Sequence, residues 1–443
     1  MQRGRVNELH PEGFVRWFRQ AAPYVHAFRG RVFVIGFGGE LVAERARLVS
    51  FVHDLNLLAA LGIRLVLVHG ARPQIEAELR AKGLRSRYSK GLRITDANSL
   101  LAVKHAAGVL RVELEALLSQ GLPNSPMAGA QIRVASGNYI TARPIGIVDG
   151  VDYQFTGEVR KVDATAIARR LDAGEVALVP HIGYSPTGEV FNLAWEDVAE
   201  SVALALKADK LLLLTDRLPV DRKGEPLSEL TAQEAESLLR KDGQPGLAAR
   251  VLRSACRALA GGVGRVHLIS RRADGGTLLE LFTHAGAGTM ITADAVQKLR
   301  QARIEDVGGI LALIEPLEAD GTLVKRNREM LEREIGNFQV LEHDGMIAGC
   351  AALYPMPEAK SAELACLAVA PEFRDAGYGE RILQACEVRA KEMKVRRLFA
   401  LTTRAAHWFI AQGFRDAGVS ALPEQRKALY NWKRGSKVFL KRI

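Results

Sequence analysis

The chain has 443 residues, about three times the usual size of one domain, so two or three domains are expected. Hydrophobic residues make up 48% of it and charged residues 25%, an ordinary globular composition that excludes a disordered or fibrous protein. The formal net charge of +11 divides almost evenly between residues 1–297 and 298–443. Because a nucleic-acid surface usually concentrates its charge, this even excess argues against a nucleic-acid partner.

The four cysteines, Cys256, Cys350, Cys366 and Cys386, have neither the paired spacing of a metal site nor the density of a disulfide scaffold. We therefore expect no bound metal and a reducing compartment. No stretch approaches the roughly 18 uncharged apolar residues of a membrane span, and the first residues lack the apolar core of a signal peptide. The sequence predicts a cytoplasmic protein that does not bind membranes.

The first 290 residues alternate short aliphatic runs with helical patterns. The strands expected from these runs cover 31–40, 63–70, 176–180, 211–216 and 266–270. Strands that are apolar on both faces and separated by helices indicate an α/β domain whose mainly parallel sheet is covered on both sides, in three layers. An aromatic-rich helix is expected over 11–29, and it must pack on this domain or on another subunit.

A separate domain of mixed α/β type is expected at 298–443, after a linker at 291–297. Its predicted elements, in chain order, are a strand at 296–304, a helix from about Glu305, strands at 338–345, 346–355 and 362–371, a helix at 376–393, a strand at 396–403, and a last helix and strand. A turn at Asp344-Gly345 joins the second and third of these strands. The chain is thus predicted to fold as domains 1–290 and 298–443.

The most specific motif is ELACLAVAPEFRDAGYGERIL, residues 363–383. An aliphatic strand ends at Val369, and the segment that follows opens a helix with Gly377 and Gly379 in or next to its first turn. Glycines there let backbone N–H groups approach an anion, and the helix dipole favours negative charge. The motif predicts a pyrophosphate site, although a glycine-rich helix start by itself is often only a cap or a turn.

The spacing Arg-x-x-Gly-x-Gly after a strand ending in Val-x-Pro resembles the Gcn5-related N-acetyltransferase (GNAT) family. Trp408-Phe409 and Gly413-Phe414 resemble a later segment of the same family. The resemblance implies acetyl-CoA as a co-substrate, with no permanently bound cofactor. The coenzyme contacts that it implies are the main chain of Leu367 and Val369 for the pantetheine, and Arg374, Gly377 and Gly379 for the pyrophosphate.

Acetyl transfer to an amine needs a base near the amine and a hydrogen-bond donor near the developing oxyanion. Glu363 is the carboxylate of the aliphatic strand, and a lone acid there is costly unless it has a function. Cys366 would face the other way in a regular strand, but a β-bulge, which the family has here, turns both toward the cleft. Cys366 is equally consistent with a small core residue. Thr402 stands where the family can place a serine that relays protons.

The first domain, in FVIGFGGE, LVLVHGARPQI and LLELFTHAGAGTMI, closely resembles the amino-acid kinase family, specifically acetylglutamate kinase. Phosphoryl transfer needs cations and glycine amides around the phosphates. The strand-one lysine of that family is Gly36 here, its three-glycine segment is Gly70-Ala71-Arg72, and no lysine occurs between Lys241 and Lys298. We expect the kinase fold without kinase chemistry.

Such a domain fused to a GNAT domain resembles the bacterial N-acetylglutamate synthase family over essentially the whole chain. The resemblance implies acetyl transfer from acetyl-CoA to the α-amine of L-glutamate, the first step of arginine biosynthesis. It implies that Arg326, Arg434 and Ser436 hold the glutamate carboxylates, and guanidinium groups suit that task. Two other classes stay open: an arginine-gated protein-lysine acetyltransferase and a non-catalytic arginine sensor.

Regulation by L-arginine is implied by a resemblance to arginine-sensitive acetylglutamate kinases. The shared features are Pro23-Tyr24 at the end of the N-terminal helix, and Glu280 followed by Gly286-Ala287-Gly288-Thr289. The resemblance implies a homo-oligomer, a ring-shaped hexamer interlaced by these helices, with arginine bound by Tyr24, Glu280, Gly286 and Gly288. The guanidinium would meet Glu280 and the effector's carboxylate the glycine-turn amides. Alternatively, residues 11–29 cover a sheet edge and Glu280 is a capping or surface acid.

Overall fold

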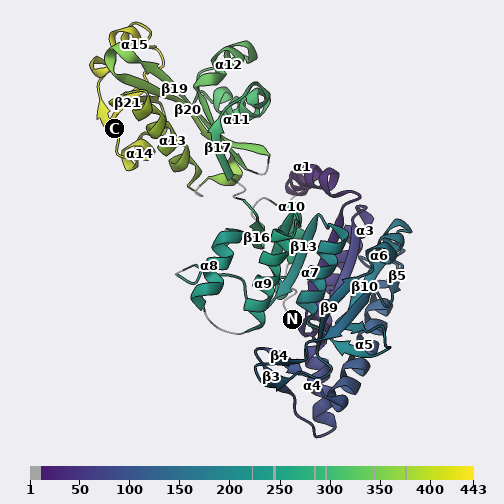
Figure 1. The fold of residues 1–443 in the computed structure, drawn as a ribbon. Helices are drawn as coiled ribbons and strands as arrows, with labels where there is room; N and C mark the ends of the chain where they lie inside the picture. The colour runs from purple at the N-terminus through teal and green to yellow at the C-terminus, as the bar shows by residue number, and fades with distance from the viewer. Residues whose placement is uncertain are drawn as a thin grey trace, which may run out of the picture. The chain divides into compact units, whose positions relative to one another are not determined.

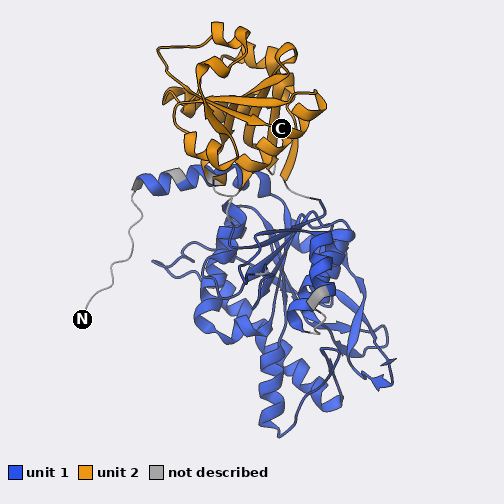
Figure 2. Cartoon of the chain, turned by 90° about the vertical axis from the view of Figure 1, so that its left-hand side faces the viewer, with its two compact units in different colours: residues 1–294 blue, residues 295–443 orange. Residues whose placement is uncertain are grey.

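The computed structural model (Figure 1) describes residues 11–221, 223–242, 246–283, 286–294, 297–343, 345–374 and 377–443. The chain forms two compact units, residues 1–294 and 295–443 (Figure 2). Strand β16 (Gly288–Thr292) belongs to the first unit, and β17 (Gln297–Gln301) opens the second. The first residues of the linker expected at 291–297 therefore belong to β16, and its last residue belongs to β17. Residues 295–296 lie outside the described residues.

The core of unit 1 is an eight-stranded sheet. In spatial order its strands are β14 (Glu229–Thr231), β16, β15 (Arg265–Ser270), β13 (Lys210–Thr215), β1 (Val32–Phe37), β2 (Arg64–His69), β10 (Val176–Pro180) and β5 (Val134–Ser136). All neighbouring strands are parallel except β15 and β16, which are antiparallel. The mainly parallel sheet predicted from the aliphatic runs is confirmed.

Helices cover both faces of this sheet (Figure 1). One face carries α1 (Pro11–Phe28), α2 (Gly39–Ala43), α3 (Arg45–Ala60), α4 (Arg72–Ala81), α5 (Ala97–Leu118) and α10 (Gly276–Phe282). The other carries α6 (Ala164–Asp172), α7 (Trp195–Leu206), α8 (Ala232–Asp242) and α9 (Leu247–Ala260). Along β1, Phe33 and Ile35 belong to the first core and Val34 to the second, as the two-residue period of a strand requires.

Smaller sheets complete unit 1 near the carboxyl ends of β2 and β10. A four-stranded sheet has the order β12 (Val190–Asn192), β11 (Ile182–Tyr184), β6 (Ile140–Pro144) and β9 (Gly157–Val162). Two-stranded ribbons pair β3 (Arg87–Ser89) with β4 (Leu92–Ile94), and β7 (Ile147–Val148) with β8 (Val151–Asp152).

Helix α1 ends at Phe28, so the Pro23-Tyr24 pair lies inside it and not at its end as predicted. Ala21, Tyr24, Val25 and Phe28 pack into the unit 1 core. Aromatic side chains of the preceding turns stay exposed: Phe14, Trp17 and Phe18. The helix therefore packs on its own unit only through its C-terminal half.

Unit 2 is built on a seven-stranded sheet. Its strands, in spatial order, are β17, β18 (Phe338–His343), β19 (Met346–Met356), β20 (Ser361–Val369), β21 (Arg397–Thr402), β23 (Lys437–Arg442) and β22 (Arg415–Ala417). Neighbours are antiparallel except β20 and β21, which are parallel. Gly345, between β18 and β19, has φ +78°, as the predicted turn requires, and Asp344 lies outside the described residues.

Five α-helices of unit 2 lie in the described part of the chain: α11 (Val307–Ala319), α12 (Arg328–Glu334), α13 (Tyr378–Glu392), α14 (Ala406–Ala411) and α15 (Glu424–Ala428). The sequence predicts one helix between about residue 305 and β18, whereas the structure has α11 and α12. Gly321, at φ +77°, follows the end of α11, and the Asn327 side chain accepts a hydrogen bond from Met330 N to cap α12. Residues at the break itself thus determine where α11 ends and where α12 begins.

Candidate functional site

Strands β20 and β21 part in the middle of the unit 2 sheet. They pair only where Ser361 to Glu363 of β20 meet Arg397 to Phe399 of β21. Beyond Glu363, the edge of β20 that would continue this pairing has no partner in β21, and such backbone groups need another partner. Leu367 and Val369 lie on this stretch, half-buried against the core beneath α13. The structure thus places both expected coenzyme contacts at an open strand edge.

A β-bulge at Cys366 changes which side of β20 its side chains face. Cys350 of β19 pairs with Ala368 and Ala352 with Ala365, so β20 has one residue more than β19 between these pairs. Cys366 has φ +51°, in the left-handed region. Leu364 packs into the core under α13, whereas Cys366 packs into the core under α11. The bulge predicted for this strand is confirmed, and it puts Cys366 on the same side as Glu363.

Glu363 is held by a guanidinium group that the sequence did not single out. Arg426 Nε donates to Glu363 Oε2 at 2.6 Å, and Arg426 Nη2 donates to Oε1 at 3.0 Å. Arg426 comes from the short helix α15, whose sequence carries no motif or periodicity that marks it. The bidentate pair fixes the orientation of the carboxylate and leaves each oxygen a lone pair for a substrate N–H.

The Cys366 thiol is 3% exposed, and burial raises its pKa to about 11. It therefore stays protonated at neutral pH and is no nucleophile. Its backbone carbonyl accepts a hydrogen bond from Cys350 Sγ at 3.5 Å. These observations favour the core-residue alternative for its side chain, while its backbone forms the bulge.

Thr402 ends β21 and is 7% exposed. Its Oγ1 accepts hydrogen bonds from Ala405 N at 2.9 Å and from Arg404 N at 3.2 Å. The hydroxyl thus caps the turn into α14, and its own hydrogen stays available as a donor. A turn-capping hydroxyl and a proton donor are compatible in one side chain.

The two glycines of the pyrophosphate motif are required for different reasons. Gly377, the N-cap of α13, has φ +75°, which side chains with a Cβ rarely adopt. At Gly379 a Cβ would lie 3.2 Å from the Trp408 ring. Tyr378 between them is fixed by a 2.7 Å hydrogen bond between its hydroxyl and His343 Nδ1. Arg374 precedes the loop and is exposed, and residues 375–376 lie outside the described residues.

Arg326 and Arg434 converge on the segment that joins α11 and α12. Arg434 Nη2 donates to Thr322 O at 2.6 Å, and Arg326 Nη1 donates to Val324 O at 3.0 Å. The Nε of Arg434 is buried without a hydrogen-bond partner among the described residues. Burial lowers the pKa of Arg326, but nearby Cys366 and Tyr354 act in the opposite direction and raise it overall. The effect of Cys366 shows that Arg326 lies beside the bulge.

Ser436 follows Arg434 by two residues, at the start of β23, and is 7% exposed. Its carbonyl accepts a 2.7 Å hydrogen bond from the Tyr430 hydroxyl. Arg326 therefore lies next to the Cys366 bulge, and Arg434 is bonded to the segment that carries Arg326, with Ser436 two residues further along the chain.

In unit 1, the predicted effector residues form one connected network. His267 Nδ1 lies 2.7 Å from Glu280 Oε1, and Lys210 Nζ lies 3.1 Å from His267 Nε2. Lys210 Nζ also lies 5.0 Å from the centre of the Phe28 ring, which is 5.9 Å from that of Tyr24. Sequence reasoning missed Lys210 and His267, which lie on strands whose patterns indicate only burial.

The glycine turn wraps the Glu280 carboxylate. Ala287 N and Gly288 N both donate to Glu280 Oε2 at 2.8 Å, so these amides are not free for an effector as the sequence suggested. A Cβ at Gly286 would lie 2.6 Å from the same oxygen, and one at Gly288 would lie 2.3 Å from Leu268 O. Burial acts in the opposite direction, but His267 and the two amides lower the pKa of Glu280.

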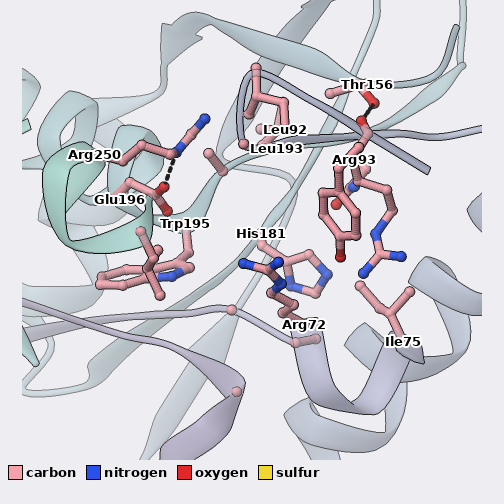
Figure 3. A pocket seen from close by; sticks show the side chains of 18 of the residues that line it. Arg72, Ile75, Leu92, Arg93, Thr156, His181, Leu193, Trp195, Glu196 and Arg250 are labelled. Atoms are coloured by element: carbon pink, nitrogen blue, oxygen red, sulfur yellow. Dashed lines mark hydrogen bonds and ion pairs between the residues drawn. The ribbon is translucent and has the colours of Figure 1, made fainter. Parts of the chain in front are cut away.

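In unit 1 a pocket lies beside Gly70-Ala71-Arg72, and Trp195 and His181 are among the other residues that line it (Figure 3). A Cβ on Gly36 would lie 2.8 Å from the Trp195 ring, and one on Gly70 would lie 2.6 Å from it. Arg72 turns to the Tyr88 ring, at 4.7 Å from its centre. Burial lowers the pKa of His181 to about 3, so its ring adds no charge. Trp195 thus occupies the space beside the strand where the family has its lysine.

No group of three or more His, Cys, Asp and Glu side chains that could hold a metal ion occurs among the described residues. Within the same residues, no helix combines the length and the apolar character needed to cross a membrane.

Residues 31–270 match the model of the amino acid kinase family, and residues 310–414 match that of the acetyltransferase (GNAT) family. An amino-acid acetyltransferase of Ralstonia nicotianae is 51% identical over 432 residues, which cover 97% of this chain and 95% of the relative. The chain belongs to the amino-acid acetyltransferase family. A second member, from Azotobacter vinelandii, is 50% identical over 431 residues and 99% of its length.

A solved structure with the same two-domain architecture is the N-acetylglutamate synthase of Neisseria gonorrhoeae in complex with coenzyme A and L-arginine. It is 42% identical, covers 97% of this chain and 99% of its own, and has a TM-score of 0.83. A second structure of that synthase contains coenzyme A and N-acetyl-glutamate. An enzyme of this family uses acetyl-CoA as its co-substrate, in agreement with the predicted GNAT motif.

We expect this amino-acid acetyltransferase to transfer no phosphoryl group from ATP to N-acetylglutamate, because Trp195 packs against Gly36, where the kinase family has its lysine, and Gly70-Ala71-Arg72 replaces the three-glycine segment. The Gly36→Lys variant should remain inactive for the same reason. The assay is ADP formation that depends on N-acetylglutamate, with an active acetylglutamate kinase as the positive control. Phosphorylated N-acetylglutamate formed by the unmodified protein would contradict this account.

Proposed function

We propose that the protein transfers the acetyl group of acetyl-CoA to the α-amine of L-glutamate, as the first step of arginine biosynthesis. The observation that carries this proposal is the position of Glu363 and Arg326 beside the bulged residue Cys366 of β20, with Arg434 bonded to the segment that carries Arg326. A base beside two guanidinium groups suits an amine that carries two carboxylates. The four cysteines are free and buried, which is consistent with a reducing cytoplasm as the site of the reaction.

Acetyl-CoA would bind along the open edge of β20. The main chain of Leu367 and Val369 offers hydrogen bonds to the pantetheine amides, and Gly377 to Gly379 at the start of α13 offer N–H groups to the pyrophosphate. This alignment brings the thioester toward the point where β20 and β21 part, close to Glu363.

L-Glutamate would bind with its carboxylates on Arg326, Arg434 and Ser436. The buried Arg434 Nε is a donor without a partner among the described residues, so a carboxylate would satisfy it. Thr322 O and Val324 O already fix the two guanidinium groups, which limits the entropy lost on binding.

Glu363 then removes one proton from the ammonium group of glutamate. The neutral amine attacks the thioester carbon and forms a tetrahedral intermediate with an oxyanion and a positively charged nitrogen. As the C–S bond breaks, the Thr402 hydroxyl would donate its hydrogen to the departing sulfur and take up the second proton of the nitrogen, so that the amide and the CoA thiol form. The first proton leaves Glu363 for the solvent. Arg426 acts as a positioning residue that holds the Glu363 carboxylate toward the amine.

We further propose that L-arginine regulates the enzyme at the network of Tyr24, Lys210, His267 and Glu280. The guanidinium of arginine would approach the ionised Glu280 carboxylate, where Lys210 now supplies the nearest positive charge through His267. The Neisseria synthase, with coenzyme A and L-arginine bound, supports the assignment of this ligand. The exposed face of α1 formed by Phe14, Trp17 and Phe18 would contact another subunit in a hexamer.

An assay with acetyl-CoA and each of the twenty amino acids, with a protein substrate in parallel, tests the activity. The proposal predicts CoA release with L-glutamate alone among them. Acetylation of the protein substrate would support a protein-lysine acetyltransferase instead, and no turnover at all would support a non-catalytic sensor.

Replacing Glu363 by Gln should leave acetyl-CoA binding intact and lower kcat by about 10² to 10⁴, since a positioned base contributes that much. The control is Glu358→Gln, which changes an exposed acid next to the same strand and should keep the parental rate. Steady-state kinetics across the pH range measure both variants. Parental kcat in Glu363→Gln at every pH would show that Glu363 is not the base.

Replacing Arg434 by Ala should raise the KM for glutamate roughly tenfold to a hundredfold and change that for acetyl-CoA little. The reason is the loss of a charge-assisted hydrogen bond, about 1.5–3 kcal/mol. Arg328→Ala, which removes an exposed arginine paired with Glu332, serves as the control. Equal increases in both KM values would point to a folding role of the C-terminal segment.

The double variant Phe14→Ser and Phe18→Ser should form smaller assemblies and lose sensitivity to L-arginine, with basal activity kept. These exposed rings stack at 5.9 Å and contribute nothing to the core of unit 1, so the fold should survive. Glu280→Gln should lose arginine sensitivity without a change in assembly. Analytical ultracentrifugation and inhibition curves measure both effects, and an unchanged hexamer with unchanged inhibition would refute the role of α1.

A further inference from the structure

Helix α3 carries an acid on its buried face. Asp54 lies between Phe51, Val52, Leu55 and Leu58 of the unit 1 core and is 8% exposed. No hydrogen bond or ion pair joins Asp54 to any residue that the structure describes. A buried carboxylate without a partner is strongly unfavourable in its ionised form. Packing alone therefore gives no reason for an acid at this position.

Asp54 borders a cavity of about 240 Å³ at the carboxyl ends of β13 and β15. Apolar side chains form much of its wall: Leu41, Phe51, Leu214 and Ile269. A volume of this size holds a small organic molecule and not merely one water, which needs roughly 10–15 Å³. Lys210 of the effector network begins β13, about 13 Å along the strand from Leu214, so the two sites are separate.

When Asp54 is ionised, the acidic groups around the cavity outnumber the basic ones. The charged groups that surround it are Glu44 and Arg47 near the start of α3, Asp216 after β13, Arg271 and Arg272 after β15, and Asp274 before α10. Glu44 pairs with Arg47 and Arg271, and Asp216 pairs with Arg271 and Arg272. Among the described residues, Asp54 and Asp274 are left without an ion pair.

We propose that this cavity binds a small organic cation, a primary ammonium group on a short aliphatic stem, with Asp54 as its counter-ion. The carboxylate would accept hydrogen bonds from the ammonium, Asp274 would add to the negative field, and the apolar wall would cover the stem. A ligand with its own carboxylate fits less well, because the neighbouring arginines already pair with acids. Two carboxylates on an apolar wall also offer too few oxygens for Ca²⁺ or Mg²⁺.

The protonation of Asp54 gives this site a measurable signature. Burial and the nearby Asp274 raise the pKa of Asp54 to about 7. Because the bound ammonium favours the ionised carboxylate, binding below that pH must release a proton and weaken about tenfold per pH unit. Binding at a site made of surface acids would show no such dependence near neutral pH.

The test is calorimetric titration of the full-length protein with n-butylammonium chloride near pH 8, with n-butanol as the uncharged control. We expect saturable binding of butylammonium, no comparable binding of butanol, and an affinity at least about tenfold lower in Asp54→Asn. The matched control Asp172→Asn, which alters an exposed acid paired with Arg64, should bind as the parent does. Titrations near pH 6 in buffers of different ionisation enthalpy should report the released proton.

The Asp54→Asn variant should also remain folded, because it removes a carboxyl group whose ionisation destabilises the native state. Unfolded Asp54 ionises near its ordinary pKa, whereas the folded side chain stays protonated up to about pH 7, so native stability falls as pH rises between these values. As pH rises over that range, the melting temperature of the parent should therefore fall relative to that of Asp54→Asn. Equal butylammonium affinity in parent and Asp54→Asn, or no saturable binding by the parent, would overturn the proposal.

Discussion

The acetyltransferase unit depends on the point at which β20 leaves β21. A regular, fully paired sheet would have closed this edge, and Glu363 and Cys366 would have faced opposite sides. The left-handed backbone at Cys366 adds one residue to β20 and turns the strand. The bulge therefore lies on the stretch of β20 that has no partner in β21, and it puts Glu363 and Cys366 on one side of the sheet.

The two units differ in the chemical groups that they bring together. Unit 2 brings Glu363, which is paired with Arg426, and Arg326 to the bulge of β20, whereas in unit 1 Trp195 packs where the kinase family has its lysine. Unit 1 contains a chain of hydrogen bonds that runs from Lys210 through His267 to Glu280. Burial and the neighbouring Lys210 lower the pKa of His267 to about 4, so a neutral ring joins Lys210 to Glu280. Because hydrogen-bonded groups polarise one another, the charge of Lys210 acts on Glu280 through this ring.

The sequence predicts those features that depend on residues close together in the chain. Aliphatic runs between helical patterns give the parallel sheet, and the glycine motif gives the start of α13. Long-range partners have no such signal, since Arg426 lies 63 positions from Glu363 and no pattern joins them. The amides of Ala287 and Gly288 lie only seven and eight positions from Glu280, but the glycine pattern does not tell whether they bind this side chain or a ligand. Helix α1 continues past Pro23 because packing of Tyr24 and Phe28 on the core outweighs the local penalty of proline.

Trp195 leaves no room for a lysine side chain at position 36. A lysine at position 36 would collide with the indole and with Ala199 and Leu213 around it, so it would damage the fold before it restored any chemistry. A smaller residue at position 195 alone would open a void in the core and gain nothing. Reversion needs both changes at once, and each is harmful by itself. No single substitution therefore restores the lysine of the kinase family in this unit without damage to the packing around Trp195.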